Sequence, residues 1–378
     1  MLDPNCKVVD FLKKTLDPPV LETINNAIAV LQDIGALSLD EQLTEMGKKL
    51  GSLPVHPLTS RMLFFSILLN CLDPALTLAC AADYRDPFSL PMLPHDKHRA
   101  DAARAKLASL YGGHSDQLAI VAAFDCWKSA KDRGLESWFC SEYFVSSNIM
   151  SMLSGMRQQL LNELKRSGFV PDDVLSCSMN ARDPGIVRAV VVAGLYPRVG
   201  RLLPPVKIGK AFLVETGSGK KARLLARSIM SKFSSHELFN EVDEGPLLVY
   251  DEITRGDAGL QVRNCTAISP LPLLLLAKEI AVVSGEENRD DPAEKDDING
   301  SHADDKVVND EGETGIPENT VKHGERIMNT PDGAVTVVID GWISFRTTAL
   351  EVAQIYCLRE RLSDAILFKV SNCIDLGV

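Results

Sequence analysis

The string Leu43-Thr44-Glu45-Met46-Gly47-Lys48-Lys49-Leu50, followed shortly by Leu53-Pro54-Val55-His56-Pro57, decides the first part of the fold. The apolar residues of the first string recur at three-and-four spacing, which places them on one face of a short helix ending near Gly51. The second string cannot be helical, because each proline biases the residue before it toward an extended conformation. The stretch therefore predicts a short helix followed by an extended connection.

A longer helix is expected just before this stretch. Pro18-Pro19 opens it, Gly35 ends it, and the apolar residues between Leu21 and Leu31 share one face. Two small helices and an extended piece are typical of a winged-helix domain, to which we assign residues 1–57.

From residue 58 to residue 170 the apolar pattern is helical throughout. Ser115 is expected to cap one helix, with Asp116 in its first turn, where a carboxylate interacts favourably with the helix dipole. A long helix is expected from about Val145 to Lys165. These features predict a helical bundle over residues 58–170.

The pattern changes after Pro171. Short apolar runs predict strands at residues 187–193, 207–215, 247–250 and 262–268. Glycine clusters separate several of these runs, as turns between strands require. Short strands with turn signals indicate a small β-barrel, which we assign to residues 171–283.

Residues 284–332 are rich in Asp, Glu, Asn and Gly and poor in apolar side chains. Such a segment cannot bury enough surface to offset the entropy of ordering, so we predict a disordered acidic insertion. A strand at Val335–Ile339 and a helix through Leu362 follow, and residues 333–378 are expected to complete the barrel. The predicted fold class is multidomain α+β: a winged helix, a helical bundle and an interrupted barrel.

Charge is segregated along the chain, whose formal net charge is −11. Residues Glu286 to Glu318 include 13 acidic and 3 basic residues, whereas Arg182 to Lys232 include 11 basic and 2 acidic residues. A basic tract within one domain is the expected footprint of phosphate binding, although charge alone equally fits a solubilising face.

The spacing of the cysteines and the interruptions of the apolar runs exclude some classes of protein. The nine cysteines include no Cys-x-x-Cys pair, which indicates reduced thiols inside the cell and argues against a zinc site. The first residues show no signal-peptide pattern, and prolines or polar residues interrupt the longest apolar runs. We therefore expect no membrane segment.

Two strings resemble parts of an ATPase. Thr216-Gly217-Ser218-Gly219-Lys220 resembles the end of a phosphate-binding P-loop, and Asp251-Glu252-Ile253-Thr254 resembles a metal-holding box. A P-loop requires a Ser or Thr after its lysine to hold magnesium, whereas position 221 is lysine. A glycine turn followed by a strand is the favoured interpretation, and no catalytic residue is assigned.

Two other groups of residues could bind a metal ion or stack on bases, but their sequence setting favours a structural role. His95 and His98 have the spacing of metal ligands, but without a third strong ligand they indicate a solvated helix start. Five aromatic residues could stack on bases, although their helical setting favours core packing. They are Trp127, Trp138, Phe139, Tyr143 and Phe144.

Several strings, taken in order, resemble the carboxyl-terminal region of DEAH/RHA-type RNA helicases, most closely the plant nuclear DEIH-box type. Near the amino terminus they are Leu16-Asp17-Pro18-Pro19 and the two strings within residues 43–57. In the predicted bundle they are Tyr84-Arg85-Asp86-Pro87-Phe88 and Ser115-Asp116-Gln117-Leu118-Ala119. In the predicted barrel they are Leu248-Val249-Tyr250-Asp251-Glu252 and, behind it, Arg263-Asn264-Cys265-Thr266. The resemblance implies a winged helix, a ratchet-like bundle and an oligonucleotide-binding (OB) fold.

The resemblance also implies two RecA-like lobes before Met1, which would bind ATP and magnesium, so this chain is expected to hold no cofactor. It is expected to be a fragment, a truncated gene product or a misannotated gene model. It implies a nuclear location, with the cytoplasm as the alternative. The family commonly has a His-Pro-x-Ser string after the first barrel hairpin, whereas this chain has Leu225-Ala226-Arg227-Ser228.

The implied partner is single-stranded RNA, held through its phosphates by basic residues of the barrel. The candidate RNA-binding residues are Arg201, Lys210, Lys220, Lys221, Arg223, Arg255 and Arg263. An alternative is a truncated interaction module that competes for the activator proteins of a helicase. An autonomous ATPase is the least favoured function.

Overall fold

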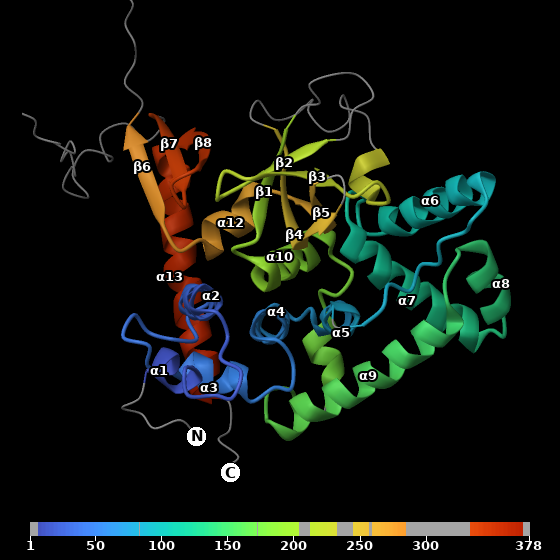
Figure 1. Ribbon diagram of the computed structural model, residues 1–378, viewed down its shortest axis with the longest axis horizontal. Helices are drawn as coiled ribbons and strands as arrows, with labels where there is room; N and C mark the ends of the chain where they lie inside the picture. Colours follow the sequence, from blue (N-terminus) through green and yellow to red (C-terminus); the bar gives the residue numbers. More distant parts are fainter. Residues whose placement is uncertain are drawn as a thin grey trace, which may run out of the picture.

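The computed structural model describes residues 7–82, 84–171, 173–203, 212–232, 245–256, 259–284 and 333–372. Helices form the lower part of the molecule, and a small barrel lies above them (Figure 1). The long helix α13 (Ala349–Asn372) runs down one side, from a sheet beside the barrel to the first helices of the chain.

The amino-terminal part contains three short helices, α1 (Val8–Leu12), α2 (Leu21–Asp33) and α3 (Glu45–Gly51). The side chain of Thr44 caps α3 by accepting a hydrogen bond from the amide of Gly47 at 2.9 Å. A Cβ on Gly47 would stand 2.1 Å from the carbonyl oxygen of Ala36, so this close approach requires glycine. The two helices predicted from the sequence here are confirmed.

The bundle follows directly. Its helices are α4 (Pro57–Leu68), α5 (Leu72–Ala82), α6 (Pro94–Ser109), α7 (Asp116–Asp132), α8 (Glu136–Glu142), α9 (Ser147–Arg166) and α10 (Pro184–Leu195), with a 3-10 turn at Val174–Ser178. The predicted cap is confirmed, since the hydroxyl of Ser115 accepts a hydrogen bond from the amide of Leu118 at 3.0 Å. Leu63, Leu118 and Met150 are fully buried in the shared core.

Helix α10 corrects one prediction, because the alternating run at residues 187–193 was expected to be a strand. Asp183 caps the helix, with its carboxylate accepting from the amides of Gly185 and Ile186 at 2.8 and 3.0 Å. Pro184 occupies the first turn, where its missing amide costs nothing. The valines of α10 pack against α4, so tertiary burial overrides their preference for strands.

The barrel is closed by five strands in the order β1-β2-β3-β5-β4. They are β1 (Val199–Leu203), β2 (Leu213–Thr216), β3 (Lys221–Leu224), β4 (Leu247–Gly256) and β5 (Gly259–Ile268). Strands β3 and β5 pair in parallel, and the other pairs are antiparallel. Leu202, Val214 and Val262 fill its interior. The predicted strands at 247–250 and 262–268 are confirmed, and that at 207–215 only in its last residues, since 204–211 lie outside the described residues.

A second sheet stands beside the barrel. It consists of β6 (Ile280–Ser284), β7 (Ala334–Ile339) and β8 (Ile343–Thr348), and the short helix α12 (Pro270–Leu276) connects it to the barrel. The prediction that residues 333–378 complete the barrel is wrong, because β1 and β4 already pair with each other and close it. The predicted acidic insertion connects β6 to β7 and, from residue 285 to 332, lies outside the described residues.

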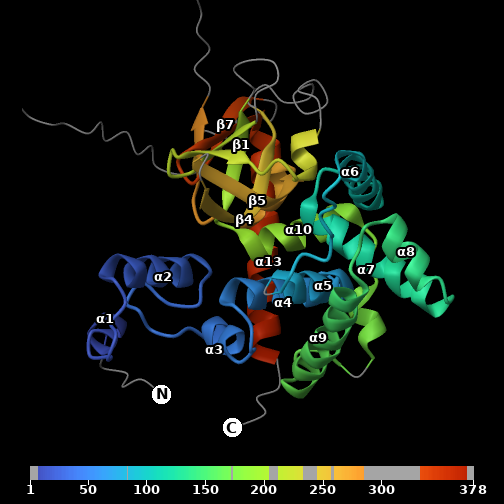
Figure 2. The ribbon, with the colours of Figure 1, turned by 45° about the vertical axis from the view of Figure 1, so that its right-hand side comes forward.

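Helix α13 ties the second sheet to the helical part. Figure 2 shows it descending past α4 toward α3. The guanidinium of Arg359 donates to the carbonyl oxygens of Leu274 and Ala277 at 2.6 and 2.8 Å, which joins α13 to the end of α12. None of the helices within the described ranges is long and apolar enough to cross a bilayer.

Candidate nucleic-acid interface

Three of the predicted basic residues lie on two strands of the barrel, β1 and β3, which flank β2. Arg201 on β1 is opposite Glu215 on β2, and Glu215 is in turn opposite Lys221 on β3. Arg223 is two residues further along β3, where it is opposite Gln261 on β5. Alternate residues of β3 are buried, so Lys221 and Arg223 both point outward. The structure thus gathers these cations on the outer surface, which we call the basic barrel face.

Lys220 lies in the turn between β2 and β3, next to this face, and is exposed. The turn is closed by hydrogen bonds from the amide of Thr216 to the carbonyl oxygen of Lys220 at 3.0 Å and from the amide of Gly219 to Thr216 at 2.8 Å. Because Lys221 directly begins strand β3 and not a helix, the glycine string is a hairpin turn, as the favoured interpretation predicts.

Arg263 on β5 extends the basic barrel face, but it is paired. Its guanidinium lies 2.7 Å from the carboxylate of Glu252, the residue opposite on β4. Arg255 is exposed near the far end of β4, and Lys210 lies outside the described residues. Of the seven predicted residues, four therefore lie on the barrel strands β1, β3 and β5, and Lys220 lies in the turn before β3.

The barrel is held on the bundle by the start of α7. Asp116 is almost completely buried, and its carboxylate accepts from the hydroxyl of Ser228 at 2.6 Å, the amide of Ile229 at 2.9 Å and the amide of Cys265 at 3.0 Å. The buried guanidinium of Arg104 stands 3.6 Å from the same carboxylate. One aspartate thus binds two separate barrel segments to the bundle.

The residues on either side of Asp116 add to this connection. The hydroxyl groups of Ser115 and Thr266 are 2.5 Å apart, and the amide nitrogen of Gln117 donates to the carbonyl oxygen of Asn264 at 2.5 Å. Thr266 also donates to the amide oxygen of Gln117. The strings Ser115–Ala119 and Arg263–Thr266 therefore contact each other, a relationship that the sequence pattern did not reveal.

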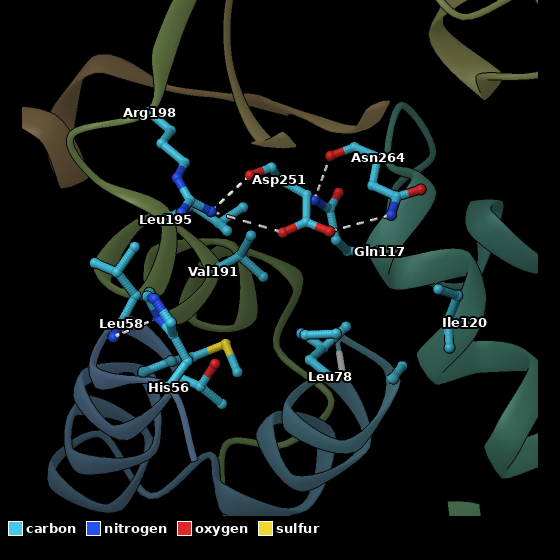
Figure 3. Close-up of a pocket in the computed structure, with 15 residues that line it drawn as sticks. His56, Leu58, Leu78, Gln117, Ile120, Val191, Leu195, Arg198, Asp251 and Asn264 are labelled. Atoms are coloured by element: carbon cyan, nitrogen blue, oxygen red, sulfur yellow. Dashed lines mark hydrogen bonds and ion pairs between the residues drawn. The ribbon is translucent and has the colours of Figure 1, made fainter. Parts of the chain in front are cut away.

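A pocket of about 180 Å³ opens where bundle and barrel meet (Figure 3). One wall is mainly apolar and includes Met62, Leu78, Ile120, Val191 and Leu195. The other wall is polar and includes Gln117, Arg198, Asp251 and Asn264, whereas His56 lies apart from these, beside Leu58 (Figure 3). We call this cavity the junction pocket.

Asp251 is the central polar group of the junction pocket. Its carboxylate lies 3.8 Å from the guanidinium of Arg198 and 3.3 Å from the side-chain amide of Asn264, while Arg198 donates to the backbone oxygen of Asp251 at 2.6 Å. Burial raises the pKa of the Asp251 carboxyl, and the amide of Asn264 and the charge of Arg198 oppose that rise. Neither contact of the carboxylate is as short as a strong charge-assisted hydrogen bond, which is about 2.7–2.9 Å.

The core packing predicted for the aromatic residues is confirmed for Trp127 and Phe139 and wrong for Trp138. Trp127 is buried and donates to the carboxylate of Glu136 at 2.9 Å, and Phe139 is buried against the ring of Tyr143. Trp138 is exposed, as are His95 and His98 at the start of α6. Over the described part of the chain, no group of three His, Cys, Asp or Glu side chains has the arrangement of a metal site.

Comparison with family models divides the chain in the same way. The winged-helix part of the helicase-associated domain (HA2) matches residues 27–55, and its ratchet-like part matches residues 56–120. An oligonucleotide/oligosaccharide-binding (OB) fold matches residues 187–280. The last match contains all five strands of the barrel.

Similar proteins are found among plant and animal helicases. The chain is 54% identical to the DExH-box ATP-dependent RNA helicase DExH6 and 49% identical to DExH2, both of Arabidopsis thaliana, over 98% of its own length. It covers 29% and 23% of those proteins. It is 32% identical to the human ATP-dependent DNA/RNA helicase DHX36 over 72% of its length, and it covers 26% of that protein. The chain thus spans less than a third of these relatives.

Proposed function

Because this chain belongs to the carboxyl-terminal winged-helix, ratchet-like and OB-fold region of DExH-box RNA helicases, we propose that it holds single-stranded RNA. The basic barrel face and the adjoining bundle would form one side of a channel for the strand. In a whole helicase, RecA-like lobes would bind ATP and magnesium and move the strand past this surface.

The observation that supports this proposal is the placement of the cations. Arg201 lies on β1, Lys221 and Arg223 lie on β3 on the other side of β2, and the exposed Lys220 adjoins them in the turn. Neighbouring strands are about 4.8 Å apart, so Arg201 and Lys221, with β2 between them, are roughly 10 Å apart across the sheet and can contact different phosphates of one extended strand. Contacts to phosphates position nucleic acid without reading its sequence, as a helicase requires.

The test is the salt dependence of binding to a single-stranded RNA of mixed sequence. Affinity of the whole chain should fall steeply with salt, because each neutralised phosphate releases counterions. The double substitution Lys220→Glu and Lys221→Glu should weaken binding and flatten that dependence. The substitutions Lys13→Glu and Lys14→Glu, two exposed lysines on the winged-helix part, change the charge equally and should have a much smaller effect. Affinity that does not depend on salt would contradict the proposal.

A second candidate function is a protein-interaction module that competes for helicase partners. Large apolar side chains are exposed on the winged-helix part, and exposed apolar patches often mark protein contacts. They are Leu16, Val20, Leu21, Leu39 and Leu43. Proteins that remain bound to the chain after nuclease treatment would support this function, whereas their loss would favour RNA as the bridge.

We also propose a nuclear location, with the cytoplasm as the alternative, on the basis of the plant helicases that the sequence resembles. Imaging of the tagged whole chain in plant cells tests this, and exclusion from the nucleus would contradict it.

A further inference from the structure

The junction pocket is a built cavity with two chemically different walls at the meeting point of bundle and barrel (Figure 3). Ligand sites combine an apolar surface with a few convergent polar groups, as this pocket does. Its volume of about 180 Å³ is below the several hundred Å³ of sites for drug-sized molecules. The pocket therefore has room for one ring system, such as a single nucleobase.

The polar wall favours a particular arrangement of donors and acceptors. Asp251 offers two carboxylate oxygens, which accept hydrogen bonds, and the neighbouring Arg198 offers guanidinium donors. Their charged groups are 3.8 Å apart, so a flat ligand edge can contact both. Guanine presents two adjacent donors, N1–H and the N2 amino group, followed by the acceptor O6. Its Watson–Crick edge therefore matches a carboxylate beside a guanidinium.

The other bases match this wall less well. Adenine offers one amino group next to an acceptor, and uracil offers one N–H between two carbonyl oxygens, which the carboxylate of Asp251 would repel. Cytosine offers one amino group beside an acceptor. The apolar wall, formed by residues such as Met62 and Leu78, would cover the face of any base equally, so the discrimination comes from the polar wall.

We propose that the junction pocket binds one unstacked guanine base of a single-stranded nucleic acid, with Asp251 accepting from N1–H and N2 and Arg198 donating to O6. Single-stranded RNA is commonly recognised through bases that leave the stack and are read on this edge. The inference rests on the proposed function, because the basic barrel face would supply the phosphate contacts and the pocket would add a preference at one position.

The preference can be tested with single-stranded 12-mers of uridine that carry one central guanosine, inosine or adenosine. Inosine keeps O6 and N1–H but lacks the N2 amino group. We expect the whole chain to bind the guanosine oligomer about tenfold more tightly than the inosine oligomer, because inosine loses one hydrogen bond to the charged carboxylate of Asp251. Fluorescence anisotropy at fixed salt gives this ratio directly. A ratio near one would overturn the inference.

Two variants assign the preference to the pocket. Asp251→Asn removes the carboxylate, and Ala81→Leu places a larger side chain at the pocket lining without removing a polar group. Either should reduce the ratio to about one, provided that circular dichroism shows a folded chain. Glu252→Gln is the matched control, since it makes the same charge change on the adjacent residue of β4 and should keep the ratio near ten.

The outcomes separate the inference from the proposed function. Salt-dependent binding of all three oligomers with equal affinity would overturn the guanine pocket and leave phosphate binding in place. A guanosine preference that survives in both pocket variants would also overturn the assignment to the junction pocket. Failure of every oligomer to bind would contradict the proposed function itself.

Discussion

Gly217 in the turn between β2 and β3 lies directly against the indole of Trp342, which belongs to the turn between β7 and β8. A Cβ on Gly217 would stand 2.9 Å from the indole nitrogen. The second sheet therefore supports the turn that carries Lys220, although the two turns are far apart in the sequence. Through this contact the sheet beside the barrel fixes one end of the basic barrel face.

Substitution of Gly217 by alanine should destabilise the chain by about 1–3 kcal/mol, because the new methyl group overlaps the ring of Trp342. Urea unfolding measures the change in free energy. In a Trp342→Ala background the space is open, and the same substitution should cost less than about 0.5 kcal/mol. Equal costs in both backgrounds would show that the contact does not determine the choice of glycine.

Asp116→Ala should destabilise the chain by about 3–5 kcal/mol. It removes three hydrogen bonds to the buried carboxylate and the nearer of the two carboxylates beside the buried guanidinium of Arg104, the other being that of Asp86. Urea unfolding should show the loss. Asp132→Ala, at the exposed end of the same helix, should change stability by no more than about 0.5 kcal/mol. A small effect of Asp116→Ala would mean that the barrel does not depend on this connection.

Glu252→Gln should strengthen binding of single-stranded RNA, because Glu252 occupies the guanidinium of Arg263 at 2.7 Å. Exposed ion pairs of this kind contribute less than about 1 kcal/mol, so we expect a gain of a few fold at low salt that disappears at high salt. Titration at two salt concentrations measures it. An unchanged affinity at low salt would exclude Arg263 from the phosphate contacts.

Asp125→Asn should change how stability depends on pH. Burial raises the pKa of the Asp125 carboxyl, whose oxygen accepts from the hydroxyl of Tyr111 at 3.0 Å. A raised pKa means that the folded chain binds this proton more tightly than the unfolded chain. The free energy of unfolding therefore falls as pH rises from about 3.9, the unfolded value, through the folded pKa.

Asparagine keeps an acceptor for Tyr111 and does not titrate. The variant should therefore gain stability relative to the natural chain, with a larger gain at pH 7.5 than at pH 4. Urea unfolding at both pH values gives the two differences. A gain that is independent of pH would show that Asp125 has no raised pKa in the folded chain.

The sequence predicted many local elements correctly. The spacing of apolar residues located α2, α3 and α9, and the cap at Ser115 forms as expected because a hydroxyl satisfies the first amides of its own helix. The strand predicted at residues 187–193 was wrong, because these valines, which favour strands, lie in helix α10. Their burial against α4 is a tertiary effect, which no local pattern contains.

For the candidate site, the sequence predicted that basic residues would bind phosphates, but it did not predict how these residues are arranged in space. The basic tract indicated phosphate binding, but only the register of the strands shows that Arg201 and Lys221 are both opposite Glu215 of β2 and that Arg263 is paired. The strings around Asp116 and Asn264 indicated only the resemblance to a family. The sequence did not predict that they contact each other where bundle and barrel meet.

By itself the sequence determined most of the helical segments, the strands β4, β5 and β7, and where charge gathers, because these properties depend mainly on neighbours within a few residues. Only the tertiary structure decided that the second sheet lies outside the barrel and that the junction pocket exists. His56, Gln117, Arg198 and Asp251 line that pocket from four distant segments. Their meeting depends on how helices and strands pack, and packing between distant segments has no period in the sequence.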